Sequence, residues 1–245
     1  DVGGLMKEPA PQFPLDHPLP DRPHRVYVAL TNNCNRSCPW CSTCSSPAGT
    51  TFLTVDEFKN SIPEAGEFQI QLEGGEPTIH PQFWEFVRIA RAKPQCERLI
   101  ICTNGVVLPR HPGRLTHWVK NLGAPLTIKI SFNHYLMDRD PGLLKLCRLL
   151  LESFEQLGGD RLLVINPRLR QGYDDDDRRV REAVEAAGLA PHSNIFFLQA
   201  YGFAKDEAGW LPPKPVSDNF TLVNPDGSKY GPDLIERSEA MRRLP

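Results

Sequence analysis

Two stretches of the chain alternate apolar and polar residues with the period of a β-strand. In the first, the apolar residues at positions 68, 70 and 72 alternate with the polar Gln69, Gln71 and Glu73. The second joins Ile128, Ile130 and Phe132 to Thr127, Lys129, Ser131 and Asn133. Strands of an ordinary parallel sheet are apolar on both faces, because helices cover both. We therefore expect the apolar face of these two strands to pack under helices and the polar face to line a barrel interior.

Strand-like and helix-like runs take turns along the middle of the chain. Strands are expected at 26–31, 67–72, 98–103, 126–133, 161–166 and 194–201, and helices at 54–61, 81–92, 112–121, 141–157 and 176–188. Such alternation is typical of parallel crossover units, which all turn with the same hand. The sequence therefore predicts an α/β fold of six strand–helix units that curl into an open barrel.

The two ends of the chain have a different character from its middle. Residues 1–24 hold six prolines and little periodicity, which predicts an extended N-terminal arm. Residues 25–202 form the expected barrel, and one domain is the natural interpretation of 245 residues. The tail 203–245 has a turn-like Asn-Pro-Asp-Gly at 224–227 and a helical end at 232–243, and we expect it to close the barrel.

Composition excludes some classes of partner and compartment. A net charge of −2 and a pI near 6.4 give no reason to expect general nucleic-acid or membrane binding. The chain has neither a long apolar run nor a charged-then-apolar leader. Seven cysteines, clustered at one place, favour a reducing compartment over a disulfide framework. We therefore expect a cytoplasmic protein.

The strongest chemical signal is the stretch C-N-R-S-C-P-W-C, which places Cys34, Cys38 and Cys41 on one short loop. Three thiolates so close together would surround one face of a compact object, and cysteines are the usual ligands of [4Fe–4S] clusters. A cluster held by three cysteines leaves one iron open for chemistry. Zinc with Cys44 as a fourth ligand, or a set of unrelated free thiols, are the alternatives.

This loop, with an aromatic residue before its last cysteine, resembles the cluster loop of the radical S-adenosylmethionine (radical SAM) superfamily. Leu72 to Pro77, L-E-G-G-E-P, resembles the family's G-G-E-P segment, which contacts the amino group of S-adenosylmethionine. The resemblance covers about residues 25–202. It implies a partial (β/α)6 TIM-like barrel, a [4Fe–4S] cluster on Cys34, Cys38 and Cys41, and S-adenosylmethionine as the second cofactor.

The resemblance also implies which residues lie beside S-adenosylmethionine. They are Trp40, the motif residues Gly74, Gly75, Glu76 and Pro77, Thr103 and Asn104 after the third strand, Ser131 and Asn133 on the fourth, and Asn166 and Arg168 at the end of the fifth. Because Gly75 has no side chain, the ligand could approach its backbone closely. On that reasoning, Gly75→Val would block cofactor binding and leave the iron content near normal.

A radical SAM enzyme is the function that these observations imply. Cleavage of S-adenosylmethionine would yield a 5′-deoxyadenosyl radical that abstracts hydrogen from a small organic molecule or a small peptide, with electrons from a donor such as flavodoxin or ferredoxin. Catalytic residues beyond the cofactor sites cannot be assigned. The alternatives are a non-catalytic or electron-transfer iron–sulfur protein and an enzyme that modifies ribosomal peptides. An electron-transfer role would leave G-G-E-P and the polar strand faces without a purpose.

Overall fold

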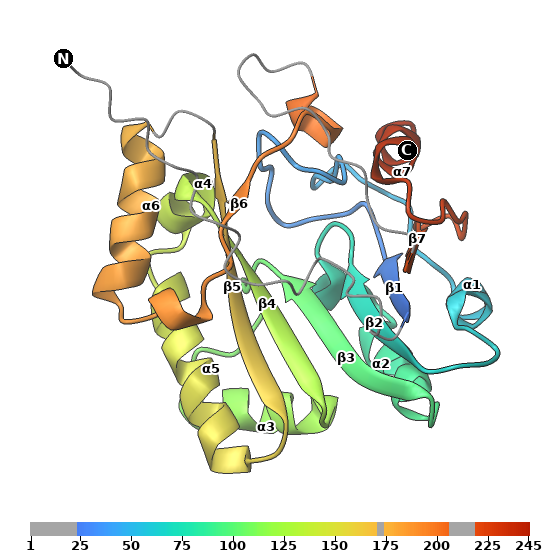
Figure 1. Cartoon of the computed structure of the whole chain (residues 1–245), viewed down its shortest axis with the longest axis horizontal. Coiled ribbons are helices and arrows are strands. Elements are labelled where there is room, and N and C mark those ends of the chain that lie inside the picture. Colours follow the sequence, from blue (N-terminus) through green and yellow to red (C-terminus); the bar gives the residue numbers. More distant parts are fainter. Residues whose placement is uncertain (1–23, 171–173, 206–218) are drawn as a thin grey trace.

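A computed structural model describes residues 24–170, 174–205 and 219–245. Seven strands of these residues form one sheet, in the order β6-β5-β4-β3-β2-β1-β7, and all neighbours pair in parallel. The strands are β1 (His24–Ala29), β2 (Phe68–Glu73), β3 (Cys96–Thr103), β4 (Leu126–Phe132), β5 (Arg161–Leu169), β6 (Phe196–Phe197) and β7 (Phe220–Val223). The sheet curls into a half-barrel (Figure 1), which confirms the predicted α/β fold.

Helices connect the strands as the sequence predicts. They are α1 (Val55–Ser61), α2 (Phe83–Arg91), α3 (Pro112–Leu122), α4 (His134–Arg139), α5 (Leu143–Leu157), α6 (Asp175–Ala186) and α7 (Leu234–Arg242). In Figure 1, α3, α5 and α6 follow the outer side of β4 and β5. Helix α1 begins as expected, because Thr54 and Glu57 form a complete capping box.

The two faces of the sheet differ in the way that the alternation predicts. Phe68, Ile70 and Leu72 of β2 are all 0% exposed, as are the apolar residues of β4. On the opposite face, Glu73 and Ser131 are only half-buried. The apolar face therefore belongs to the core beneath the helices, and the polar face is the inward face of the half-barrel.

The prediction of a strand at 194–201 is too long. Only Phe196 and Phe197 form β6, although an isolated bridge between Ile165 and Ser193 keeps the same register with β5. Pro167 of β5 has no backbone N–H to donate, and this removes one hydrogen bond from the ladder. The sheet therefore continues past β5 as an irregular edge.

The tail contributes a strand that the six-unit prediction lacks. β7 pairs in parallel with β1, from Arg25 opposite Phe220 to Val28 opposite Val223. The expected turn follows it, since the N–H of Gly227 donates to the carbonyl of Asn224 at 2.9 Å. The run F-T-L-V before that turn is the sequence signal of this strand. Part of the tail is thus built into the sheet.

The predicted helix at 141–157 is preceded by a second, shorter one. α4 begins after Asn133, whose side-chain oxygen accepts from the N–H of Leu136 at 2.8 Å, and α5 starts only at Leu143. Asn133 therefore caps a helix instead of continuing β4, because asparagine is among the best N-cap residues.

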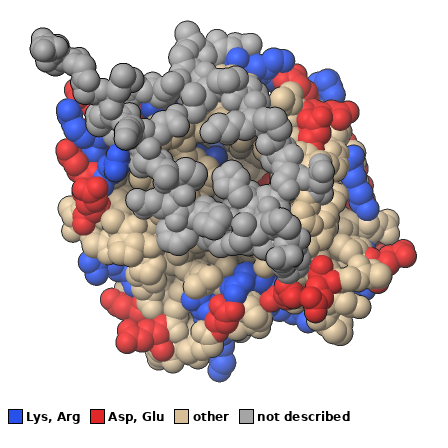
Figure 2. All heavy atoms as spheres, viewed as in Figure 1, with Lys and Arg blue, Asp and Glu red and all other residues tan. Residues whose placement is uncertain are grey.

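The surface gives two further observations. On the face shown in Figure 2, basic and acidic residues are intermixed and form no patch of one sign. Among the described residues, no helix is long and apolar enough to cross a membrane. The predicted N-terminal arm lies outside the described residues, apart from His24.

Candidate functional site

The three motif cysteines lie on the loop between β1 and α1, at the carboxyl end of the parallel strands. The N–H of Cys34 donates to the carbonyl of Ser46 at 3.0 Å, and that of Cys41 donates to Cys38 at 3.2 Å. The hydroxyl of Thr43 donates to the carbonyl of Gly74 at 3.1 Å, which ties the loop to the G-G-E-P segment. The loop and the segment thus form one unit.

The thiols of this loop are close enough to influence one another. Burial above all, with a smaller contribution from the charge of Cys41, raises the pKa of Cys34 and of Cys38 to about 12. A thiol with so high a pKa is protonated at neutral pH, so binding iron must displace its proton. The loop therefore presents its sulfurs together, in a form that a metal centre has to deprotonate.

Cys44 contacts the tail helix α7. Its sulfur lies 3.9 Å from the carbonyl of Ser238 in α7, and its backbone takes a left-handed φ of 51°. In the part of the chain that the structure describes, no three His, Cys, Asp or Glu side chains form a group that could hold a metal ion. A zinc ion needs all its ligands at one point, whereas each iron of a cluster takes its own thiolate. The zinc alternative with Cys44 has no support in this geometry.

Gly74 and Gly75 are packed against the stem of the cysteine loop. A Cβ on Gly75 would lie 1.9 Å from the carbonyl oxygen of Asn33, and one on Gly74 would lie 2.6 Å from that of Thr31. The N–H of Gly75 donates to Thr31 and that of Glu76 to Asn33. Glycine is therefore required at both positions because a side chain would collide with the backbone of the cysteine loop's stem. Because a valine here would also displace the stem of the cysteine loop, this geometry disfavours the expectation that Gly75→Val would spare the iron site.

Glu76 is the centre of a buried hydrogen-bond network. It is 1% exposed, and its carboxylate accepts from the hydroxyl and N–H of Thr78, the hydroxyl of Thr103 at 2.6 Å and the N–H of Asn104 at 2.8 Å. Burial raises its pKa, and these hydrogen bonds lower it again. Pro77 starts the short helix η2 (Pro77–Ile79) that presents Thr78. The carboxylate thus joins the end of β2 to the end of β3.

Two of the expected cofactor residues contact the cysteines. The side-chain amide of Asn104 donates to the sulfur of Cys34 at 3.6 Å and to the side chain of Asn35 at 2.7 Å. Asn133, besides capping α4, hydrogen-bonds the thiol of Cys38 and lowers its pKa. Hydrogen bonds to cluster sulfurs tune a cluster's potential. These asparagines are thus placed to act on the sulfurs.

The remaining expected residues lie along the same end of β4 and β5. Ser131 and Asn166 face each other in register. The side-chain oxygen of Asn166 is buried and has no hydrogen-bond partner among the described residues. The guanidinium of Arg168 lies 4.8 Å from the centre of the Phe196 ring. Trp40 packs 5.1 Å from the ring of His134, next to Arg170.

These residues fit the two groups that the sequence implies. Three neighbouring thiols suit an iron–sulfur cluster, and the buried amide oxygen of Asn166 is open to a donor from a bound molecule. One residue of the site was missed by sequence reasoning. Arg237 of α7 forms a buried ion pair with Glu73 at 2.8 Å. No sequence signal connects residues so far apart.

Fold and site together define a partial α/β barrel with a three-cysteine loop at the carboxyl end of its strands. The family model of the radical SAM superfamily matches residues 28–156, so the chain belongs to the radical SAM superfamily. Its members bind a [4Fe–4S] cluster and S-adenosylmethionine.

Several known proteins are similar to this chain. GTP 3′,8-cyclase of Chlorobaculum tepidum is 36% identical over 109 residues, which cover 43% of this chain and 33% of that protein. The 7,8-dihydro-6-hydroxymethylpterin dimethyltransferase of Methanocaldococcus jannaschii is 25% identical over 165 residues, 61% of this chain and 31% of the relative. The chain thus spans about a third of the length of these relatives. The crystal structure of BtrN in complex with AdoMet and 2-DOIA has a TM-score of 0.41 at 16% identity, and covers 89% of this chain and 76% of that one.

Proposed function

We propose that this radical SAM enzyme abstracts a hydrogen atom from a small organic molecule bound against the inward face of β2, β3 and β4. The observation that carries the proposal is the polar inward face beside the cysteine loop. Glu73 lies directly before Gly74, and Ser131 ends the same face on β4. Polar side chains on the inward face of an α/β barrel are explained if a polar ligand contacts them.

The roles of the protein's own residues follow from their positions. Cys34, Cys38 and Cys41 would hold the cluster, while Gly74, Gly75, Trp40, Ser131, Asn166 and Arg168 would surround S-adenosylmethionine. When bound, the two groups supply a 5′-deoxyadenosyl radical. The residues of the chain bind the two groups, orient them and exclude water from the site. Asn104 and Asn133 would fix the cysteine side chains and tune the cluster.

The names of the relatives support a small-molecule substrate. One acts on GTP and the other on a dihydropterin. Both molecules are small and polar, which matches the polar inward face.

We also propose a division between barrel and tail at 202–203, an electron donor such as flavodoxin or ferredoxin, and a reducing compartment such as the cytoplasm. The last rests on the seven cysteines, all of which are free.

A deuterium-transfer experiment tests the proposal. Anaerobically reconstituted protein is incubated with S-adenosylmethionine, a reductant and deuterated candidates, namely GTP, 7,8-dihydropterins and short peptides. Mass spectrometry then measures the label in 5′-deoxyadenosine. We expect label from a small molecule and none with Cys38→Ala. Label from a peptide alone would contradict the substrate proposal.

A further inference from the structure

A chain of hydrogen bonds runs from the tail into the half-barrel. Asn224, after β7, is fully buried, and its side-chain oxygen accepts from Nε of Arg237 at 3.0 Å. Arg237 donates through Nη2 to Oε1 of Glu73 at 2.8 Å. The second oxygen of Glu73 accepts from the side-chain amide of Gln71. Each link uses groups that are largely shielded from water, since Arg237 and Glu73 are 4% and 14% exposed.

The chain of hydrogen bonds ends at an acceptor. Gln71 is 4% exposed, and its Oε1 has no hydrogen-bond partner within the described residues. An ionised carboxylate only accepts hydrogen bonds. The amide of Gln71 must therefore turn its NH2 group toward Glu73, and this orientation fixes Oε1 as the free acceptor. Leaving a buried acceptor without a donor costs folding free energy.

The surroundings of Gln71 define what can supply the missing donor. It lies on the inward face in register with Tyr27 of β1 and Ile100 of β3. It lies two residues before Glu73, where β2 ends, which is about 7 Å along the strand. A molecule that touches Gln71 would therefore lie deeper in the half-barrel than a group held at the cysteine loop, within the length of a small substrate.

The burial of this acceptor disfavours a cationic donor, because bringing a charge into a buried site is costly. The carboxylate of Glu73 is already paired with Arg237. Cys102 of β3 lies in register with Lys129 of β4. Burial and the charge of Glu73 raise the pKa of Cys102 to about 11, against the opposing charge of Lys129, so the thiol is neutral. The face thus offers one neutral acceptor, which a neutral donor can meet without adding a charge.

We propose that Gln71 is a substrate-binding residue whose side-chain oxygen accepts a hydrogen bond from a neutral N–H group of a heterocyclic substrate. This inference rests on the proposed function and names the substrate class of the same site. Glu73 and Arg237 act as positioning residues, since they fix the orientation of the amide. Guanine and pterin rings, which the names of the two relatives contain, both carry such N–H groups.

The first test measures the stability of the full-length holoprotein. Gln71→Met removes the free acceptor and keeps a side chain of similar length. The variant also loses the hydrogen bond that Gln71 donates to Glu73, while it relieves the unpaired Oε1, so the melting temperature should fall less than in the control. Gln69→Met is the matched control, because Oε1 of Gln69 accepts from Arg25 at 3.2 and 2.9 Å. This control should lower the melting temperature. A fall of the same size with Gln71→Met would overturn the proposal.

The second test measures binding by calorimetry, with GTP and 7,8-dihydropterin as the probes. Wild-type holoprotein should bind at least one of them, and Gln71→Met should weaken that binding about 5- to 150-fold, the effect of 1–3 kcal/mol. Gln156→Met, an exposed position of α5 far in sequence from the inward face, should bind like the wild type. Equal affinity of Gln71→Met and wild type would overturn the role of Gln71.

Failure of the substrate class and failure of the proposed function give different results. A wild type that converts S-adenosylmethionine to 5′-deoxyadenosine but binds neither probe would refute the heterocycle and keep the radical function. A wild type that binds a probe but forms no 5′-deoxyadenosine would refute the proposed function, while Gln71 would retain its role as a ligand residue.

Discussion

Single buried polar residues hold the site together through local hydrogen bonds. His80 is one example: its Nδ1 accepts from the N–H of Gln82 at 3.0 Å, so the other nitrogen carries the hydrogen and lies 3.0 Å from the carbonyl of Leu53. Its ring also packs 4.7 Å from Phe86. His80 is therefore a neutral structural residue beside the G-G-E-P segment, and a second proton would break the bond with Gln82.

This arrangement predicts a dependence of stability on pH. Burial lowers the pKa of His80 below its usual value of 6.5. The unfolded chain then binds more protons than the folded chain below about pH 6.5, so stability falls as the pH falls through that range. Urea unfolding at pH 8 and pH 5.5 should show a larger loss for the wild type than for His80→Gln. Equal losses would contradict this account of His80.

Residue types were easier to predict than their contacts. The motifs select Asn104 and Asn133 as residues beside S-adenosylmethionine, which stays a prediction. In the structure, Asn104 contacts Cys34, while Asn133 bonds Cys38 and caps α4. Which way a side chain turns depends on partners from other strands. That Arg168 lies beside S-adenosylmethionine stays a prediction, and its guanidinium lies over Phe196.

At the scale of elements, the end of β2 packs directly against the start of the cysteine loop. Gly75 has no room for a Cβ beside Asn33, the residue before Cys34. We therefore expect Gly75→Val to lower the free energy of unfolding by about 1–3 kcal/mol and to reduce iron content as well as cofactor binding. Thermal melting and iron analysis of the reconstituted protein would measure both.

Gly113 provides the matched control for this variant. It lies in the first turn of α3, and an added Cβ would meet only the ring of His111 at an ordinary 3.7 Å. Gly113→Ala should raise stability by about 0.5–1 kcal/mol. A Gly75→Val protein with wild-type iron content would show that the loop tolerates the clash.

Long, strongly patterned elements were predictable, and short ones were not. The strands with alternating faces and the long helix α5 lie close to their predicted ranges. The two-residue β6 and the four-residue β7 depend on which neighbour supplies their hydrogen bonds. α4 depends on one capping residue. These features are decided by tertiary contacts more than by local pattern.

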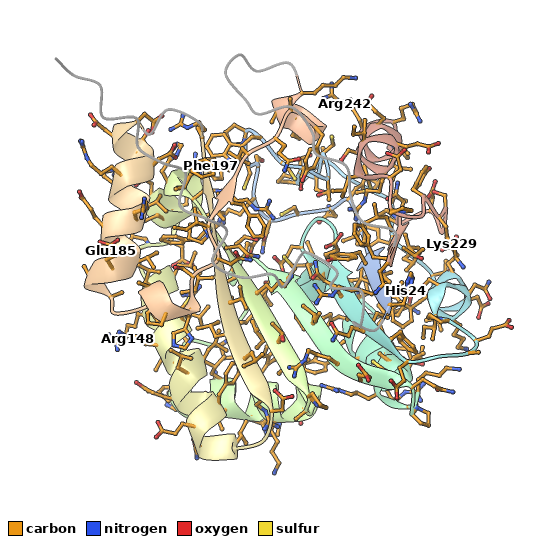
Figure 3. The ribbon with its side chains drawn as sticks, viewed as in Figure 1. His24, Arg148, Glu185, Phe197, Lys229 and Arg242 are labelled. Atoms are coloured by element: carbon orange, nitrogen blue, oxygen red, sulfur yellow. The ribbon has the colours of Figure 1, made fainter. Side chains whose placement is uncertain are left out.

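At the scale of the whole molecule, the tail is attached to the barrel at several points. The hydroxyl of Ser238 in α7 donates to the carbonyl of Ser42 at 2.6 Å. The N–H of Phe203 donates to the carbonyl of Cys41 at 2.9 Å. Figure 3 shows Arg242 at the end of α7 near η4 (Gly202–Ala204), where it donates to the carbonyl of Gly202. The tail therefore supports the cysteine loop, and the sequence alone gave no sign of these contacts.

The buried ion pair makes this attachment measurable. Arg237→Met should lower the free energy of unfolding by about 3–5 kcal/mol, because it leaves the carboxylate of Glu73 without its partner. Lys205→Met is the control, since the pair between Lys205 and Glu239 is exposed and screened by water and should contribute little to stability. Denaturant unfolding of the two variants compares them directly. Similar small losses would mean that the tail is only loosely joined.

The central claim is that three cysteines of one loop hold a cluster that supports cleavage of S-adenosylmethionine. The most direct measurement is iron content together with 5′-deoxyadenosine formation in anaerobically reconstituted wild type, Cys38→Ala and Cys44→Ala. We predict about four irons and 5′-deoxyadenosine for the wild type and Cys44→Ala, and neither for Cys38→Ala. Loss of both in Cys44→Ala with retention in Cys38→Ala would contradict the claim.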